Sequence, residues 1–429
     1  MIRDLGDGLI LRAGTPGDGD ALVAWGREAF REPDGSEDSE ILPWIRDLVE
    51  GEHPTFRPEY WRIVEEPGTG RIVSALCLIP QTWAYRAIEI PVGRVEIVAT
   101  LPEFRRRGLI GVLMDEIHAL SADMGHLMQV IEGIPWFYRR FGYEMAVPLH
   151  GNRRLPRGDV PALKDGEEER FGFRPAADTD LPLLTDLFAE AADRYLITCR
   201  RDLEAWRLEL GGRSEGGAGL RVIEVIERGG VAVGFVVSWP AGERTSRYVM
   251  GAELVEGVSW GEVGPALFRH MAATSPEKVS AISLQLGDEH PLYDAMWHLL
   301  GDGFRPYAWY ARVPDVTGFL RRVAPVLEWR LAESAFDGHT GEVKISWFDG
   351  GVRLLLERGL ISVEEWAPTS HEDGDLGFPG MTFLSLLFGR RSLRELREAH
   401  PDCVAYTQAA MPLADALFPK WPSWVYGID

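Results

Sequence analysis

Two consecutive segments, VEIVAT (residues 95–100) and LPEFRRRGLI (residues 101–110), decide the fold of this chain. The first is apolar and rich in β-branched residues, which predicts a buried strand. The second carries three arginines and a glycine ahead of an apolar-periodic run through His118, which predicts a short loop and then an amphipathic helix. Unpaired backbone N–H groups, the helix dipole and the arginines at such a helix start together favour a pyrophosphate.

A second informative segment, FYRRFGY (residues 137–143), predicts an aromatic helical turn that ends at Gly142 and enters another strand. With the first segments, at this spacing, it resembles the acetyl-CoA site of the GNAT superfamily of N-acetyltransferases. That resemblance implies a mixed sheet with helices on both faces. The elements expected upstream fit this order: a strand at 9–13, a helix at 20–30, a hairpin of strands at 60–65 and 71–79, and a strand at 86–92. Residues 31–59 are polar and proline-broken, and we expect a helical or loop excursion near a cleft there.

The chain begins a similar pattern again after a proline-, glycine- and charge-rich stretch, residues 151–170, which predicts a linker. Residues 173–180 echo residues 11–18, and a strand through Arg312 ends the second copy, so we expect a weak internal duplication. The second copy has no Arg-x-x-Gly loop: residues 256–264 contain no basic residue. We therefore expect a degenerate, structural domain that helps to wall the substrate cleft.

A third unit begins after Val313-Pro314-Asp315. Its expected order is a helix at 316–332, a strand pair at 341–357, and further helices, which resembles a sterol-carrier-protein-like α+β domain. The predicted fold class is therefore α/β and α+β, with two tandem GNAT-like mixed-sheet domains and a sterol-carrier-like third domain. The predicted ranges are 1–150 for the catalytic domain, 151–170 for the linker, 171–313 for the degenerate domain and 314–429 for the third.

This three-part organisation resembles the Eis (enhanced intracellular survival) family of N-acetyltransferases. The resemblance implies that acetyl-CoA binds the first domain and that the acetyl group passes to an amine, aminoglycosides among them. It also implies a homo-oligomer, with a hexamer as the family expectation. Cofactor binding is expected from residues of the key strand, the loop and the segment before the aromatic turn: Ile97, Val98, Ala99, Arg105, Arg106, Arg107, Gly108, Leu109, Ile110, Glu132 and Gly133. Ile110 stands where the family pattern has glycine or alanine, and Gly111 follows it.

The resemblance assigns the general acid to Tyr138, whose hydroxyl would protonate the departing thiolate. For the base it implies the carboxylate at Asp429, delivered by the tail at residues 421–426, whose aromatic and proline residues indicate docking. Whether the α-carboxylate or the side chain would act stays open. Glu96 is the rival base, since a lone charge in an apolar strand either faces a cleft or pairs with an arginine such as Arg94.

Composition narrows the function classes. The net charge of −21 argues against a nucleic-acid binder and suits a small cationic acceptor, although solubility alone explains it equally well. The sequence shows no apolar run long enough to span a bilayer and no signal-peptide core, so we expect a cytoplasmic protein with no membrane partner. Three scattered cysteines and the absence of a ligand cluster predict neither disulfides nor a metal site.

Three functions remain open at this stage. The first is an amine N-acetyltransferase acting on a polyamine- or aminoglycoside-like substrate. The second is a protein or peptide lysine N-acetyltransferase that uses the same site. The third is a non-catalytic acetyl-CoA or lipid-binding protein, which an apolar tunnel in residues 316–429 would support. Five aromatic residues could line the acceptor cleft, although each also fits a core: Trp25, Phe30, Trp44, Trp61 and Trp83.

Overall fold

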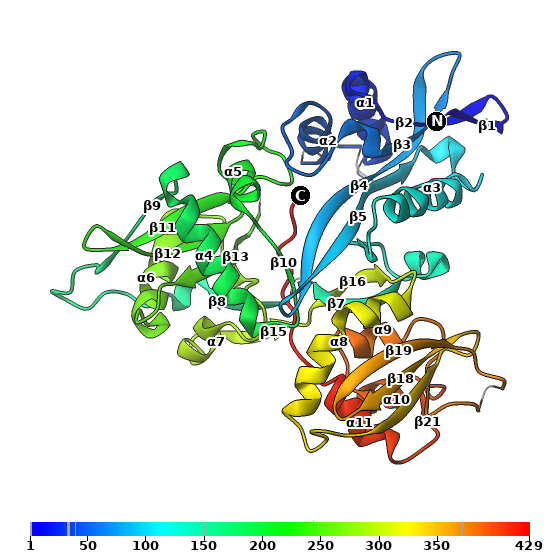
Figure 1. Cartoon of the computed structure of the whole chain (residues 1–429). Coiled ribbons are helices and arrows are strands. Elements are labelled where there is room, and N and C mark those ends of the chain that lie inside the picture. Colours follow the sequence, from blue (N-terminus) through cyan, green and yellow to red (C-terminus); the bar gives the residue numbers. More distant parts are fainter. Residues whose placement is uncertain (1, 32–34, 39, 150, 243, 371) are drawn as a thin grey trace.

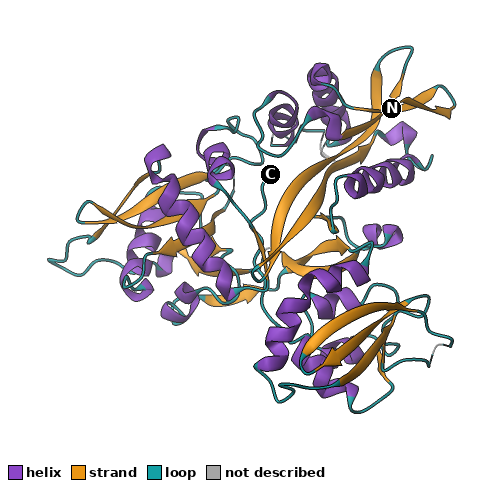
Figure 2. Ribbon diagram, in the orientation of Figure 1, coloured by secondary structure: helices purple, strands orange, loops and turns teal. Residues whose placement is uncertain are grey.

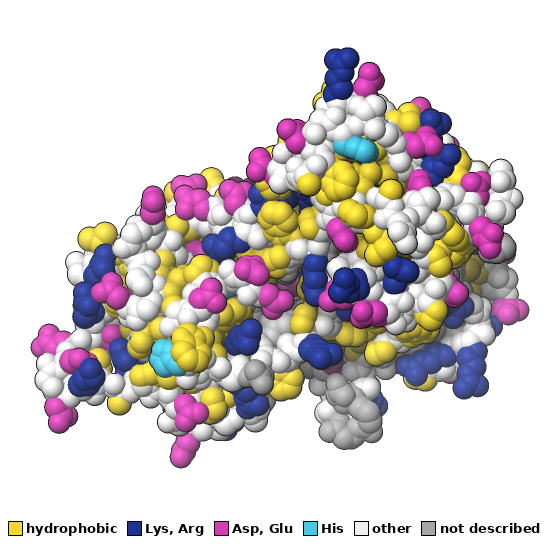
Figure 3. Space-filling model, turned by 90° about the horizontal axis from the view of Figure 1, so that it is seen from below, with side chains coloured by type: hydrophobic (Ala, Val, Ile, Leu, Met, Phe, Trp, Pro, Cys, Tyr) yellow, Lys and Arg dark blue, Asp and Glu magenta, His cyan; other side chains and the backbone are white. Residues whose placement is uncertain are grey.

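The computed structural model describes residues 2–31, 35–38, 40–149, 151–242, 244–370 and 372–429. Three sheets, each flanked by helices, make up the molecule (Figure 2). Basic, acidic and hydrophobic side chains are interspersed over the face seen in Figure 3. Among the described residues, no helix is both long and apolar enough to cross a membrane.

The first sheet is built around two long antiparallel strands, β4 (Arg71–Tyr85) and β5 (Ile88–Thr100). Helices α1 (Gly19–Ala29) and α2 (Ile41–Glu50) lie on one side of this ribbon and α3 (Leu109–Asp123) on the other (Figure 1). The remaining strands are β1 (Ile2–Gly6), β2 (Leu9–Ala13), β3 (Trp61–Glu66), β6 (Met128–Ile131), β7 (Glu144–Leu149), β10 (Ile197–Cys199) and β16 (Tyr307–Arg312). The expected helix at 20–30 and the hairpin of β3 and β4 are confirmed, and α2 is the excursion expected within residues 31–59.

The second sheet has the strand order β15-β8-β14-β13-β12-β11-β9. Its strands are β8 (Asn152–Pro156), β9 (Phe171–Pro175), β11 (Val222–Arg228), β12 (Val231–Ser238), β13 (Ser246–Leu254), β14 (Ala281–Leu284) and β15 (Gly301–Phe304). Its helices are α4 (Leu181–Ala191), α5 (Leu203–Gly211), α6 (Trp260–Ala273) and α7 (Pro291–Ala295). Near its start this unit repeats an ion pair of the first: Arg12 bonds Asp18 at 2.6 Å, and Arg174 bonds Asp180 at 2.7 Å. The echo between the two sequence segments is therefore also an echo in structure.

Three strands cross the ranges expected from the sequence. One of them, β10, lies within the expected second domain yet pairs with β4 of the first sheet. Strand β8 lies within residues 151–170, the expected linker, yet it pairs with β14 and β15 in the second sheet. Strand β16, allotted to the second domain, lies between β6 and β7 of the first sheet. Strand pairing supplies hydrogen bonds that a linker or an open edge would lack. The first two units therefore share strands, and the ranges 1–150 and 171–313 do not correspond to separate sheets.

The third sheet has the order β19-β18-β17-β20-β21. Its strands are β17 (Gly341–Ser346), β18 (Gly351–Glu357), β19 (Leu360–Trp366), β20 (Leu376–Gly377) and β21 (Val404–Ala405). Helix α8 (Val316–Ala332) matches the expected helix and packs against this sheet with α9 (Phe383–Leu387), α10 (Leu393–Ala399) and α11 (Ala410–Leu417). Large side chains such as Phe378, Phe388 and Leu393 are fully buried between these elements. They belong to one buried hydrophobic cluster.

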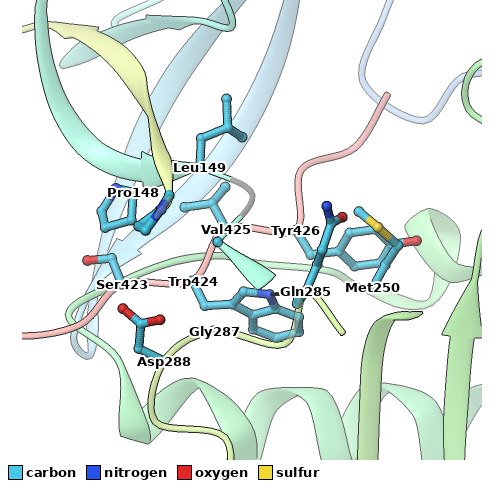
Figure 4. Close-up of a pocket in the computed structure, with 12 residues that line it drawn as sticks. Pro148, Leu149, Met250, Gln285, Gly287, Asp288, Ser423, Trp424, Val425 and Tyr426 are labelled. Carbon is cyan, nitrogen blue, oxygen red and sulfur yellow. Dashed lines mark hydrogen bonds between the residues drawn. The ribbon is translucent and has the colours of Figure 1, made fainter. Parts of the chain in front are cut away.

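The last eleven residues leave the third domain and run between the first two (Figure 1). Trp424 is buried beside Gly287 and donates from its indole N–H to the carbonyl of Gln285 at 3.1 Å (Figure 4). Arg201 donates to the carbonyls of Tyr426 and Gly427, at 3.1 and 2.7 Å. These contacts direct the chain end toward strand β5, so the tail is docked as expected.

Candidate active site

Strand β5 separates from β6 where the site begins. The two strands pair in parallel only over Val92–Arg94 and residues 128–130, and from there to Thr100 β5 is paired with β4 alone. Opposite β4 the ladder slips between Cys77↔Glu96 and Ala75↔Ala99, which is a β-bulge. Ile97, inside the bulge, has φ of 55°, a left-handed conformation that is costly for a β-branched residue. The bulge and the separation together open a gap in the sheet.

A cavity of about 660 Å³ lies along this gap. Strand β5 contributes Val98, Ala99 and Thr100 to its wall, and Phe30 also lines it. The loop and the start of α3 contribute five of the predicted cofactor residues: Arg105, Arg106, Gly108, Leu109 and Ile110. The short helix η4 (Phe137–Phe141) closes the other side with Tyr138 and Arg140.

The start of α3 suits a pyrophosphate. Gly108 has φ of 78° and caps the helix, so the backbone turns sharply from the arginine loop into the first turn. The first amides of a helix have no intrahelical acceptor, and a Cβ at Gly111 would meet no atom within 4 Å. Arg105 and Arg106 stand on the same rim. Donors, cations and open space therefore meet at one point, as an acyl-CoA diphosphate requires.

Tyr138 lines this cavity, and its side chain is largely buried. The ring packs edge-on against Tyr143 and Tyr310, with centroids 6.3 and 5.8 Å away. Among the described residues no hydrogen bond to the hydroxyl is found. Burial, and then the charge of Glu96, raise the pKa of Tyr138 well above its ordinary value, so it stays a proton donor at neutral pH.

Gly133 fixes the position of Tyr138. A Cβ at residue 133 would lie 2.4 Å from a ring carbon of Tyr138 and 3.2 Å from Tyr310. We therefore expect Gly133→Ala to displace the tyrosine and to lower kcat by up to about 100-fold. Steady-state kinetics check this against Gly158→Ala, where a Cβ would meet nothing within 4 Å and activity should persist. Equal activities of the two variants would contradict this role for Gly133.

A second cavity, of about 190 Å³, meets strand β5 just before the bulge. It lies where the first domain, the second domain and the chain end come together. Four carboxylate residues and two arginines line it: Glu40, Glu96, Glu132, Asp429, Arg94 and Arg221. The remaining wall is largely aromatic and apolar: Trp44, Trp239, Trp309, Met250, Val425 and Tyr426, with Ala218 and Gly427.

Arg94 organises the charges of this second cavity. Arg94 is 3% exposed, and its guanidinium lies over the Trp309 ring at 5.1 Å. It donates to Glu96 at 2.7 Å, to Asp429 Oδ1 at 2.6 Å and to Glu132 at 3.3 Å. A buried cation needs such partners, and the three carboxylates are in turn held in fixed positions by it.

The two carboxyl groups of Asp429 have different surroundings. Its side chain is held by Arg94 and, at 2.6 Å, by Arg221, so two cations neutralise it. These arginines hold the pKa of the Asp429 side chain well below its usual range, against the effect of burial. The main-chain oxygen instead contacts His53 Nε2 at 3.0 Å. The side-chain carboxylate therefore anchors Asp429. The main-chain carboxyl oxygen, by contrast, contacts a histidine rather than an arginine.

Burial raises the pKa of Glu96 to about 7, although Arg94 opposes the shift. In the unfolded chain the group ionises near 4.5, so Glu96 favours folding at low pH, and this contribution is lost as pH rises through 7. Glu96→Gln lacks this ionisation. Between pH 5 and pH 8 we therefore expect the unaltered protein to lose roughly 1–3 kcal/mol more of its unfolding free energy than Glu96→Gln loses. Denaturant titrations across this range test it, with the exposed Glu52→Gln as control. Parallel pH curves for the unaltered protein and Glu96→Gln would contradict it.

The structure distributes the predicted cofactor residues unevenly. The Ile97 side chain is buried in the core, and Arg107 points away to Asp7 at 3.2 Å. Glu132 lies in the second cavity with Arg94, and Gly133 packs on Tyr138. Val98, Ala99, Gly108 and residues 105–106 and 109–110 do line the first cavity.

Sequence reasoning missed several residues of the second cavity. Arg221, Trp239 and Met250 come from the second domain, and nothing in their local sequence indicates a site. His53 lies within residues 31–59, which were expected to lie near a cleft. A histidine in that segment was the one signal that could have marked it as a site residue. Of the five aromatic candidates, Trp44 lines the second cavity and Phe30 the first. The other three are core residues: Trp25, Trp61 and Trp83.

A family model described as an acetyltransferase (GNAT) domain matches residues 11–146. The matched range holds strand β5, the arginine loop, α3 and Tyr138. The N-terminal domain belongs to the GNAT family of acetyltransferases. Residues 11–146 thus form a GNAT-type acyltransferase domain, and members of this family use acyl-CoA donors. Among curated proteins, no sequence matches this chain.

Three solved structures share the fold over nearly the whole length. A GCN5-related N-acetyltransferase from Kribbella flavida is 18% identical, with 98% of each chain covered and a TM-score of 0.64. A probable N-acyltransferase from Enterococcus faecalis is 15% identical, with 98% of this chain and 100% of the other covered and a TM-score of 0.70. Eis1 from Mycobacterium abscessus is 18% identical, with 95% and 96% covered and a TM-score of 0.58. The resemblance and the fold class inferred from the sequence are therefore confirmed.

Proposed function

We propose that this enzyme transfers acetyl from acetyl-CoA to a primary amine of a small cationic acceptor. The diphosphate would lie at the start of α3, and the thioester would reach the part of β5 that lies between the two cavities. The observation that carries this proposal is that two cavities are both lined by strand β5. The first cavity also contains a tyrosine that can donate a proton, and the second contains carboxylates.

The composition of the second cavity supports a cationic acceptor. Four carboxylate residues face two arginines there, which favours a positively charged guest. The indole of Trp44 adds a face that attracts an ammonium group, whereas arginines already lie over the rings of Trp239 and Trp309. With a volume of about 190 Å³, the cavity accommodates one amine-bearing arm of a larger molecule.

In the proposed reaction the amine nitrogen bonds to the carbonyl carbon of the thioester, and the carbon–sulfur bond breaks. Tyr138 gives its proton to the departing sulfur. The proton lost by the amine passes to the carboxylate at Asp429. Of its two carboxyl groups, the main-chain one suits this role, because Arg94 and Arg221 already neutralise the side chain. Glu96 is the alternative base: its pKa of about 7 matches the task, although its contact with Arg94 restrains it.

The test is CoA release from acetyl-CoA with a panel of polyamines, aminoglycosides and lysine peptides, alongside calorimetric measurement of acetyl-CoA binding. We expect turnover with the polyamines or aminoglycosides and little with the peptides. Turnover confined to lysine peptides would favour a protein acetyltransferase. Tight acetyl-CoA binding without turnover of any amine would indicate a non-catalytic acetyl-CoA-binding protein.

A further inference from the structure

His53 lies in the loop between α2 and β3, far from the acetyltransferase motifs in sequence. Its ring reaches the chain end, where Nε2 is 3.0 Å from the main-chain oxygen of Asp429. The same ring accepts two backbone N–H bonds at Nδ1, from Thr55 at 3.2 Å and from Phe56 at 3.0 Å. Three contacts therefore fix both the position and the orientation of the ring.

These contacts also fix the tautomer. Because two N–H groups point at Nδ1, that nitrogen carries no proton, and in the neutral ring the proton is on Nε2. Burial and then the charge of Arg213 lower the pKa of His53 to about 4. At neutral pH the ring is therefore an uncharged donor aimed at Asp429.

We propose that His53 is a positioning residue that orients the terminal carboxylate of Asp429, by an Nε2–H bond, for deprotonation of the amine. This inference rests on the proposed function, in which that carboxylate is the base. An uncharged donor orients a carboxylate without pairing its charge, whereas a second cation would lower its basicity further. The arginines hold the side chain, and His53 holds the oxygen that must remain basic.

Several charged groups face Asp429 and contribute to any titration of its main-chain carboxyl. Arg94 and Glu96 approach from β5, and Glu132 from the end of β6. From the second domain come Arg221, at 2.6 Å from the side chain, and Arg213, which acts on both His53 and Asp429. The variants below leave all of these groups in place, so a change in the carboxyl pKa reports on the histidine.

The chain offers a matched control in His290. Its Nε2 is 2.7 Å from the carbonyl of Ala252, and its Nδ1 accepts the N–H of Leu292 at 3.1 Å. It is buried in the second domain and lines neither cavity of the site. Loss of His290 therefore reproduces the structural cost of removing a buried histidine with the same tautomer, without touching the chain end.

The experiment compares His53→Ala and His53→Gln with His290→Ala and His290→Gln. For His53→Ala we expect kcat to fall about 10- to 100-fold with KM for acetyl-CoA unchanged. The acidic limb of the rate profile should move up by about one pH unit, because the ionised carboxyl loses a donor. His53→Gln, whose amide N–H can replace Nε2–H, should recover much of the rate. The His290 variants should lose thermal stability only.

A second readout does not require turnover. Incorporation of aspartate labelled with ¹³C at the main-chain carboxyl leaves the chain end as the titrating labelled carbon, and NMR then gives its pKa directly. We expect this pKa to rise by about one unit in His53→Ala and to stay constant in His290→Ala. An unchanged pKa, or equal rate losses in both alanine variants, would overturn the role of His53. Absence of turnover in the unaltered protein would instead overturn the proposed function.

Discussion

Replacement of Tyr138 by phenylalanine is expected to lower kcat by about 100- to 10,000-fold, the range that general acid catalysis contributes. The phenylalanine ring keeps the edge contacts with Tyr143 and Tyr310 and loses only the hydroxyl. Tyr138 lines the first cavity, and its hydroxyl has no hydrogen-bond partner among the described residues, so the loss of that hydroxyl leaves no orphaned group inside the protein. The fold and the affinity for acetyl-CoA should therefore persist.

Tyr143→Phe is the matched control for this prediction. Tyr143 is buried in the same aromatic cluster, and its hydroxyl bonds His118 at 3.0 Å rather than facing a cavity. Its loss should cost about 1 kcal/mol of stability and leave the rate unchanged. Steady-state kinetics and acetyl-CoA calorimetry on both variants decide the matter. Comparable rates for Tyr138→Phe and the unaltered enzyme would show that solvent or another group protonates the sulfur.

The first cavity was largely predictable because its residues follow one another in sequence. A strand, an arginine loop ended by glycine and a helix start form a local unit, so Val98, Arg105 and Gly108 could be placed without knowing the rest of the fold. The bulge at Ile97 directs that side chain into the core. The preference of isoleucine for strands could not indicate this direction. A left-handed isoleucine is a case of tertiary context overriding local preference.

The second cavity could be predicted only in part, because it is assembled from parts of the chain that lie far apart in sequence. Glu96 and Asp429 were expected as rival bases, but their shared partner Arg94 makes them members of one network. Arg221 reaches this network from the second domain. Such contacts depend on how the domains pack, and the exchange of strands β8 and β16 sets that packing. The duplicated pattern indicated two domains, and it could not show that they share strands.

Removal of Ile428 and Asp429 is expected to lower turnover by about 100- to 10,000-fold, because the proposed base is lost. It should also destabilise the fold by about 3–5 kcal/mol, because Arg94 and Arg221 lose the carboxylate that pairs with both of them. Kinetics and denaturant unfolding measure the two effects separately, yet truncation alone cannot assign the loss of rate to a particular oxygen.

Two variants of the chain end separate the anchor from the base. Asp429→Asn removes the side-chain charge and keeps the terminal carboxylate, so it should lose stability and retain most of its turnover. Extension by a single glycine keeps the side chain with Arg94 and Arg221 and moves the terminal carboxylate by about 3.8 Å, so it should retain stability and lose turnover. The reverse pattern would make the Asp429 side chain the base. Full turnover in the extended and truncated chains alike would leave Glu96, with its raised pKa of about 7, as the group that takes the proton.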